Sequence, residues 1–277
     1  MVNFDGNCYQ KLSDIPDQFL NYFLELPIHT HHFLNYDGKI IKLEESYFSI
    51  MASLRRSRVR IPMKYTLEYF QEQAETIIDD IKILDGYSLT LIKFYRKKNP
   101  TKESPVCDIC FLMESLPVEW KSESIFLTLY KDHHILAESF SNLFQSNELL
   151  RKLAKVFAYE NNFGACLLIN NEKKIAESTH GSVFLIFGNK VLTPPLSSGV
   201  VDTFSRKIMI KFITQNNSYQ IVEEEISVYN LQRADEIFLF SFVYGLTKIS
   251  QFRKKKFSTG LSKNIQDLFF YQLKNQF

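Results

Sequence analysis

The sequence lacks the features that would assign it to a disulfide-rich or metal-binding class. It contains four cysteines in 277 residues, Cys8, Cys107, Cys110 and Cys166, which are too few for a disulfide scaffold in a chain of this length. Cys107 and Cys110 have no second pair to complete a tetrahedral zinc site. We therefore expect ordinary strand thiols and no metal site.

Long apolar runs are also absent. The longest largely apolar stretch, Ile237 to Tyr244, is far shorter than the roughly 20 residues that a membrane helix needs. The opening residues MVNFDGNCYQ do not pair a basic segment with an apolar one, as a signal peptide does. The sequence therefore predicts no membrane segment and a cytoplasmic location. With 45% hydrophobic residues, the chain can bury one large core or two moderate ones.

A strong excess of one charge is missing as well, since the net charge is +2. Two basic clusters, RRSRVR at residues 55–60 and RKKK at residues 253–256, contain no interleaved aromatic side chains. This pattern favours solvated surfaces over a nucleic-acid site. In IHTHHF, His29 and His31 share one face of a predicted strand, and two histidines without a third ligand favour strand packing over metal binding.

The order of predicted elements indicates an α+β protein with two domains. A smaller α+β domain covers residues 1–116, LPVEW at residues 116–120 is a linker, and a larger strand-rich α+β domain covers residues 121–277. In the first domain, residues 27–43 predict a hairpin that turns at Asp37 and Gly38, whose residue types tolerate positive φ. Pro62 opens a helix over residues 63–81 with a core face of Leu67, Phe70, Ala74, Ile77, Ile78 and Ile81. Residues 87–116 predict two strands around an Asn-Pro-Thr loop.

The second domain begins with a predicted strand at residues 124–130. A helix at residues 147–159, capped by Ser146 or Asn147, places Leu150, Leu153, Ala154 and Phe157 on one face. Four short strands follow at residues 165–170, 174–178, 182–187 and 190–193. The remaining predicted elements are a helix at 204–214, a strand at 220–225, a short helix, strands at 236–243 and 247–250, and a helix at 262–276.

The stretch AESTHGSVFLIFGNKVLTPPLSSGVVDTFSR, residues 176–206, resembles the class-IV aminotransferase family, the pyridoxal-phosphate enzymes of fold type IV. The resemblance rests on Glu177, Phe184, Thr193-Pro194-Pro195 and Thr203-Phe204-Ser205-Arg206, with Ser182 where the family has Asn. RADEIFLFSFVYGLTKI, LAKVFAYENNFGACLLIN and GKIIKLEESY resemble further family segments in the same order. The resemblance implies a two-domain fold of the D-amino-acid aminotransferase type, a homodimer and a ligand cleft between the domains.

The resemblance also assigns cofactor contacts, and their chemistry is plausible on physical grounds. A desolvated carboxylate such as Glu177 can keep a pyridine nitrogen protonated, so that the ring withdraws electrons. The amides of Phe204 and Ser205 at a helix start can bind a phosphate. Ser241 follows as a further cofactor-binding position. These assignments predict pyridoxal phosphate as the cofactor of the family scaffold.

Several residues depart from the family pattern where the chemistry occurs. The Schiff-base lysine aligns with Phe144, which has no amine and so cannot act as nucleophile or proton shuttle. The family's phosphate-binding arginine aligns with Ser49, and the histidine before it with Ser46. Glu148 stands where a tyrosine often follows, and Phe242 follows Ser241 at positions that are small or polar in the family.

Two hypotheses remain open at this point. In the first, the chain is a degenerate family member that forms no Schiff base and binds a small ligand or a protein partner, with no nucleic acid and no membrane. In the second, it is an active pyridoxal-phosphate aminotransferase or aminodeoxychorismate-lyase-like enzyme, and another lysine, such as Lys131, serves. Lys152 and Lys155 lie roughly 12 to 17 Å along the helix from Phe144, too far to replace a lysine there.

Overall fold

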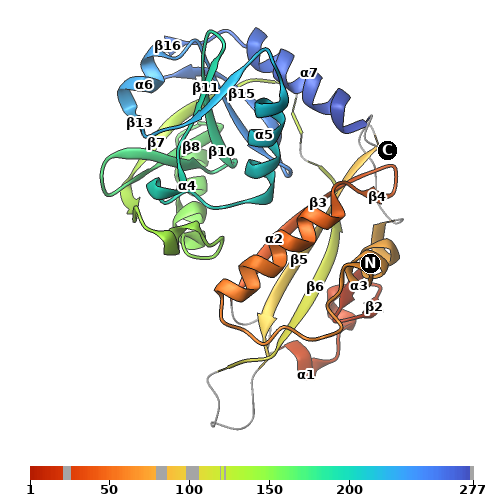
Figure 1. Cartoon of the computed structure of the whole chain (residues 1–277). Coiled ribbons are helices and arrows are strands. Elements are labelled where there is room, and N and C mark those ends of the chain that lie inside the picture. Colours follow the sequence, from red (N-terminus) through yellow and green to blue (C-terminus); the bar gives the residue numbers. More distant parts are fainter. Residues whose placement is uncertain (21–25, 79–85, 98–105, 119, 122, 275–277) are drawn as a thin grey trace. The chain divides into compact units, whose positions relative to one another are not determined.

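A computed structural model describes residues 1–20, 26–78, 86–97, 106–118, 120–121 and 123–274. The chain divides into two compact units, Met1–Val118 and Glu119–Phe277 (Figure 1). Each unit has its own mixed set of helices and strands and its own sheet, so the fold is α+β. The linker role of residues 116–120 stays a prediction.

The first unit is built on a six-stranded sheet in the order β2-β1-β6-β5-β3-β4, and every neighbouring pair in it is antiparallel. The predicted hairpin is confirmed, because β3 and β4 pair around Asp37 and Gly38, whose φ angles are 47° and 76°. The two strands predicted within residues 87–116 are confirmed as β5 and β6, while their connecting loop at 98–105 lies outside the described residues. The strands are β1 Val2–Phe4, β2 Asn7–Tyr9, β3 His29–Tyr36, β4 Lys39–Ile40, β5 Tyr87–Arg96 and β6 Ile109–Leu116.

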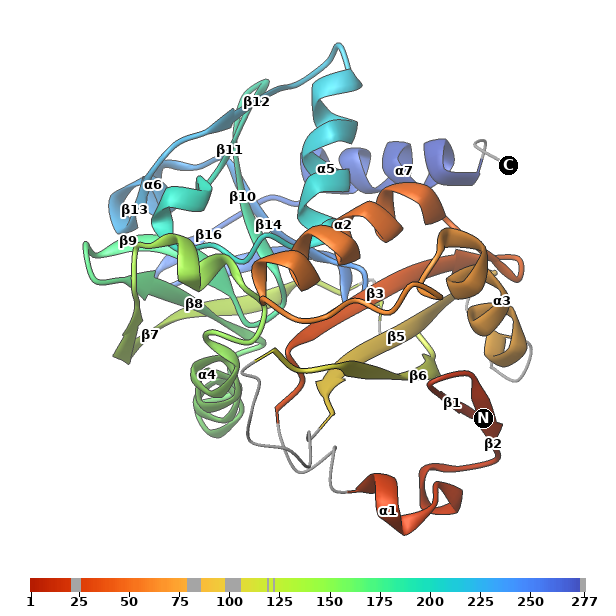
Figure 2. The ribbon, with the colours of Figure 1, turned by 60° about the horizontal axis from the view of Figure 1, so that its bottom comes forward.

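Two helices of the first unit, α2 (Leu43–Arg56) and α3 (Leu67–Ile78), pack against the sheet around one shared core (Figure 2). Helix α3 begins four residues later than predicted because Thr66 caps it, its hydroxyl accepting from the Tyr69 amide at 3.2 Å. Four predicted core residues of α3 are buried, Leu67 is half-buried, and Ile81 lies outside the described residues. Short helices lie earlier in the chain, η1 at Leu12–Asp14 and α1 at Asp17–Leu20.

The second unit contains a ten-stranded sheet in the order β12-β11-β10-β14-β15-β7-β8-β9-β13, with β16 paired to β15. The four predicted short strands are confirmed at their predicted residues, as β8 Ala165–Asn170, β9 Lys174–Ser178, β10 Ser182–Phe187 and β11 Lys190–Thr193. The sheet pairs in parallel at β15–β7, β7–β8 and β11–β12. The other strands are β7 Ile125–Ile135, β12 Gln220–Glu223, β13 Ile226–Ser227, β14 Glu236–Ser241, β15 Gly245–Phe252 and β16 Lys255–Lys256.

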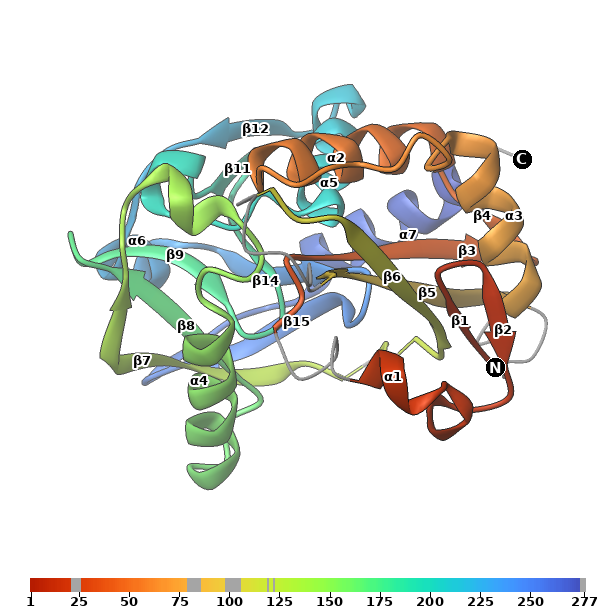
Figure 3. The ribbon, with the colours of Figure 1, turned by 90° about the horizontal axis from the view of Figure 1, so that it is seen from below.

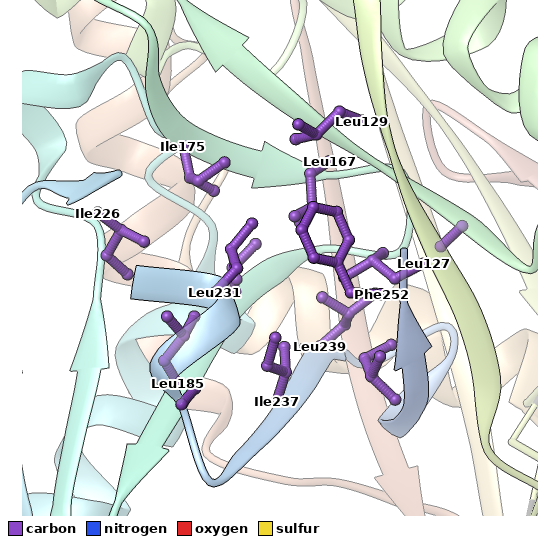
Figure 4. Close-up of a cluster of buried hydrophobic side chains, with 14 of the residues drawn as sticks. Leu127, Leu129, Leu167, Ile175, Leu185, Ile226, Leu231, Ile237, Leu239 and Phe252 are labelled. Atoms are coloured by element: carbon purple, nitrogen blue, oxygen red, sulfur yellow. The ribbon is translucent and has the colours of Figure 1, made fainter. Parts of the chain in front are cut away.

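One apolar cluster receives side chains from both ends of this sheet, which shows that the sheet curves around it. Leu167, Leu185 and Leu239 come from three different strands, and Leu231 closes the cluster from the short helix α6, Val228–Arg233 (Figure 4). Full burial of such side chains stabilises a fold by about 1.5–3 kcal/mol each before the entropy cost of ordering. The elements around this core are therefore held firmly in register.

Helix α4 (Glu148–Glu160) packs on β7 and β8 through Ala154 and Ala158, with Leu150 and Phe157 partly buried (Figure 3). The expectation that Leu153 belongs to this core face is wrong, since 41% of Leu153 is exposed. Two alanines let the helix lie close to the strands, which leaves Leu153 beyond the rim of the contact. Neither Ser146 nor Asn147 makes a side-chain cap to this helix.

The other helices of the second unit are α5 (Phe204–Gln215) and α7 (Gly260–Lys274), with 3-10 turns η2 at Ser139–Asn142 and η3 at Leu196–Ser198. Phe212 of α5 and Phe269 of α7 meet edge to face, and Phe269 also meets Phe240 of β14. Both helices therefore lie on the same face of the sheet. Within the described part of the chain, no helix is long and apolar enough to cross a membrane.

The four cysteines are free thiols, and Cys110 and Cys166 are buried, as expected for strand cysteines. Burial raises the pKa of each of these two thiols to about 12, so both stay protonated at neutral pH. His29 and His31 share the buried face of β3, and His32 lies on the other face. No metal-binding cluster of His, Cys, Asp and Glu forms among the residues with described positions.

Candidate functional site

Glu177 lies on β9 opposite Leu168 of β8, and only 5% of it is exposed. The preceding residues Ile175 and Ala176 are fully buried, so this part of β9 lies in the interior of the second unit. A buried carboxylate is costly without partners that donate hydrogen bonds or carry positive charge. The partners of Glu177 therefore define what this site can do.

Arg151 of α4 is the charged partner of Glu177. Its Nη1 lies 2.9 Å from Oε1 of Glu177, and both side chains are largely buried, with 14% and 6% exposed. The second carboxylate oxygen, Oε2, accepts a hydrogen bond from the Val201 amide at 3.3 Å. Both oxygens of Glu177 are thus engaged by groups of this chain.

Phe144 lies in the turn that precedes α4, and the same arginine reaches it. Nη2 of Arg151 donates a hydrogen bond to the Phe144 carbonyl, and the guanidinium lies 4.9 Å from the centroid of the Phe144 ring. A cation over an aromatic face is favourable, the more so when it is desolvated. One guanidinium therefore joins the position predicted for the lysine to the predicted cofactor carboxylate.

The start of α5 is tied to Glu177 in space through Val201. Val201, which donates to Glu177, precedes Phe204 by three residues, a span of at most about 11 Å. Thr203 caps α5, because its hydroxyl accepts from the Arg206 amide at 3.2 Å and lies 3.2 Å from the Ser205 hydroxyl. Phe204 and Ser205 are each 7% exposed, so the first turn of this helix is largely covered.

Asn142 holds the loop that leads to α5. The side-chain amide of Asn142 donates hydrogen bonds to the backbone carbonyls of Leu196 at 2.8 Å and Val200 at 2.7 Å. Its backbone carbonyl accepts a hydrogen bond from the Asp202 amide at 3.0 Å. Three bonds to one loop fix its path without regular secondary structure. Asn142 therefore positions Val201 against Glu177.

Ser241 ends β14, and its hydroxyl accepts from the Tyr244 amide at 3.2 Å. The next residue, Phe242, packs edge to face on Phe204 with ring centroids 5.9 Å apart. Gly181 meets the same strand end, since a Cβ there would lie 2.3 Å from the Phe240 carbonyl oxygen. The structure thus gathers the predicted residues Glu177, Phe204, Ser205 and Ser241 around neighbouring loops of the second unit.

His180 lies in the turn between β9 and β10 and contacts Tyr244, with ring centroids 4.1 Å apart. Lys155 of α4 lies 3.1 Å from the Tyr244 hydroxyl. Burial, together with the positive charges of Lys155 and Lys121, lowers the pKa of His180 to about 4. This imidazole is therefore neutral at physiological pH.

The remaining predicted positions have other contacts. Lys152 pairs with Glu148 at 2.8 Å, Lys155 reaches Tyr244, and Lys131 is exposed on β7. Ser46 is buried and Ser49 is half-buried, and both lie in α2 of the first unit. The Glu177 carboxylate is bound by Arg151 and by the Val201 amide.

Arg151 and Asn142 are the site residues that sequence reasoning did not identify. A signal for Arg151 exists, because it precedes the buried Ala154 and Ala158 by three and seven residues and so lies on the buried face of α4. An arginine on a buried helix face requires an acidic partner. No comparable pattern in the sequence marks Asn142.

Comparison with known proteins shows which family the chain resembles. A profile of the family amino-transferase class IV matches residues 33–252. The chain is 24% identical over 122 residues to a probable branched-chain-amino-acid aminotransferase of Aquifex aeolicus, a match that covers 43% of this chain and 39% of that protein. It is 22% identical over 224 residues to D-alanine aminotransferase of Staphylococcus epidermidis, covering 77% of this chain and 76% of that protein.

A solved branched-chain amino acid aminotransferase from Thermobaculum terrenum, in its PLP form, superposes with a TM-score of 0.83 at 15% identity. That comparison covers 100% of this chain and 94% of the other. The shared architecture is that of fold type IV, with helices and strands in the same arrangement. Because the family profile spans most of the sequence, the chain belongs to the class-IV aminotransferase family.

Proposed function

We propose that this chain keeps the fold-type IV scaffold of a pyridoxal-phosphate-dependent family but forms no Schiff base, and that it serves as a non-covalent binding scaffold. The observation that carries the proposal is Phe144, the residue at the lysine position, which lies directly before α4 and has no amine. A Schiff base requires a nucleophilic nitrogen at this place, and the same amine normally moves the proton of the substrate.

The contacts of nearby lysines support the proposal. Lys152 is bound to Glu148, and Lys155 lies beside Tyr244 and His180. Both lysines lie on α4, beyond the turn that contains Phe144. Either side chain would have to give up these contacts to replace the missing amine. Lys131 is exposed on β7.

The described residues do not fit a Schiff-base cofactor in this arrangement. Glu177, which would accept from a protonated ring nitrogen, already accepts from Arg151 and Val201. Phe144 offers a ring face and a carbonyl to the same arginine instead of an amine. Pyridoxal phosphate therefore has no catalytic role in the proposed scaffold.

The visible absorption spectrum of the purified protein, recorded during incubation with pyridoxal phosphate, tests the proposal. A protein without the Schiff base shows only the spectrum of free pyridoxal phosphate, at any protein concentration. A saturable shift to the band of a protein-bound Schiff base would instead support the family's ordinary function, an active aminotransferase or aminodeoxychorismate-lyase-like enzyme. Denatured protein is the control, because its surface lysines react without a site.

We also propose that the chain forms a homodimer and binds a small ligand, as the family resemblance implies. Three exposed apolar side chains on one face of α4 support a partner surface, Leu149 at 68%, Leu153 at 41% and Val156 at 54% exposed. Sedimentation at micromolar concentration tests this. A dimer that Leu153→Glu converts to monomer agrees with the proposal, and a monomeric unmodified protein contradicts it.

A further inference from the structure

We infer that Arg151 is a built-in occupant of the Glu177 carboxylate, and that its planar guanidinium takes the place of a protonated ligand ring and excludes such rings. The inference rests on the proposed function only in treating Glu177 as the former cofactor carboxylate. Beyond the proposed function, it identifies Arg151 as the group that now fills the site. It also names planar cations as the class of ligand that the carboxylate would otherwise bind.

The charge of Glu177 requires a cation beside it. Glu177 is 6% exposed at its side chain and needs a cation, because an isolated buried carboxylate is strongly unfavourable. Arg151 supplies this cation, with Nη1 2.9 Å from Oε1 of Glu177. A protonated pyridine ring would satisfy the same carboxylate, so the two cations compete for one acceptor.

The flat shape of the guanidinium matches that of a protonated ligand ring. A guanidinium is flat and delocalised, and it binds by stacking on an aromatic face and by hydrogen bonds in its own plane. Arg151 uses both modes at once, over the Phe144 ring at 4.9 Å and toward Glu177 at 2.9 Å. A compact ammonium such as that of lysine would provide the charge without the flat face.

Several contacts hold the Arg151 guanidinium in place at the same time. One terminal nitrogen donates to Glu177 and the other to the Phe144 carbonyl, while the ring covers one face. Its side chain is 14% exposed, which leaves little room for a ligand beside it. A ring that is to reach Glu177 must therefore displace Arg151.

The test is chemical rescue of Arg151→Ala in the full-length protein, followed by thermal melting. The variant leaves Glu177 buried without its cation and lowers the melting temperature by roughly 6–12 °C. Methylguanidinium and protonated aminopyridine, added separately at millimolar concentration, should raise the melting temperature of Arg151→Ala by several degrees. Neither should stabilise the unmodified protein, and methylammonium, a compact cation, should rescue much less.

Two matched variants complete the experiment. Lys152→Ala removes the neighbouring ion pair of α4, in which Lys152 is 62% exposed and Glu148 20%, and should melt closer to the unmodified protein than Arg151→Ala does, without any response to the planar cations. Arg151→Ala combined with Glu177→Gln should melt above Arg151→Ala alone and lose the rescue, because the uncompensated charge is gone. If Arg151→Ala does not fold, Arg151→Met, which keeps the stem, takes its place with the same expectations.

The inference is overturned if the planar cations stabilise the unmodified protein as much as the arginine variant, or if rescue survives Glu177→Gln. It is also overturned if a folded Arg151 variant shows no response to either planar cation. These outcomes are independent of the Schiff-base proposal, since neither probe carries an aldehyde.

Discussion

Glu236 and Ser262 are joined by two hydrogen bonds, from the Ser262 amide at 2.8 Å and from the Ser262 hydroxyl at 2.7 Å, both to Oε2 of Glu236. The other carboxylate oxygen accepts from the Leu261 amide at 2.9 Å and the Ser258 hydroxyl at 2.8 Å. A carboxylate at the first residue of β14 therefore caps the start of α7, where the helix dipole favours negative charge.

These contacts predict an acid-sensitive attachment of α7. Burial alone raises the pKa of Glu236, but the hydrogen bonds from Ser262, Leu261 and Ser258 outweigh it and leave the pKa below the ordinary value of 4.5. Because the folded pKa lies below the unfolded one, the stabilisation is present above pH 4.5 and is lost as the pH falls through the lower folded value.

Glu236→Gln should lower the free energy of unfolding by about 1.5–3 kcal/mol at neutral pH and flatten its dependence on acid pH. Urea unfolding at several pH values measures both effects. Glu114→Gln is the control, since the Lys93–Glu114 pair lies 3.5 Å apart with 31% and 24% of the side chains exposed. If Glu236→Gln kept the full acid dependence, Glu236 would not be the group responsible.

Gly181 and Gly188 offer a matched pair for the turns beside the site. Gly181 has a φ of +120° and a Cβ there would meet the Phe240 carbonyl at 2.3 Å, whereas Gly188, with φ of +57°, has nothing within 4 Å. Gly181→Ala should cost at least about 2 kcal/mol of stability, and Gly188→Ala about 1 kcal/mol or less. Urea unfolding compares them, and equal costs would show that the close contact with β14 is unimportant.

His180 should titrate far below an ordinary histidine. Its pKa of about 4, against 6.5, means that stability present above pH 6.5 declines as the pH falls toward 4. The imidazole proton signals in an NMR titration report this pKa directly. Lys155→Met removes one of the causes and should raise it, while Lys152→Met, on the same helix, should leave it unchanged. A midpoint near 6.5 in the unmodified protein would refute the burial of His180.

Most elements of the second unit could be predicted from the sequence because their signals are local. Turn residues at Asn170–Asn171 and Gly188–Asn189 separate β8 to β11, and each strand lies where the pattern placed it. Strand β7 extends to Ile135 through the polar residues Lys131 to His134, because Ile135 pairs with Asn170 of β8. No local sequence pattern predicts this extension of β7.

The candidate site was only partly predictable, because some of its contacts join residues that lie far apart in the sequence. Glu177, Phe204, Ser205 and Ser241 follow from a resemblance that extends along the chain. The ion pair of Glu177 with Arg151 joins residues 26 positions apart, and the bonds of Asn142 reach a loop more than 50 positions away. Such contacts depend on how α4 and β9 pack, which composition and spacing do not specify.

Placing a lysine at position 144 should not be sufficient to restore Schiff-base formation. Phe144→Lys places an ammonium next to Arg151, which remains bound to Glu177, so the new amine should form little Schiff base with pyridoxal phosphate. Combining Phe144→Lys with Arg151→Ala should increase the yield of Schiff base, because Glu177 then no longer binds a guanidinium. Intact mass after borohydride reduction measures each step, and full labelling of Phe144→Lys alone would mean that Arg151 is no obstacle.

Borohydride reduction of the unmodified protein with pyridoxal phosphate, followed by peptide mass mapping, tests the central claim most directly. The account predicts no stoichiometric label on any lysine, and only scattered low labelling that the denatured protein shows as well. A single stoichiometric label on Lys131, Lys152 or Lys155, prevented by prior addition of a competing substrate amine, would contradict the account and establish an active pyridoxal-phosphate enzyme.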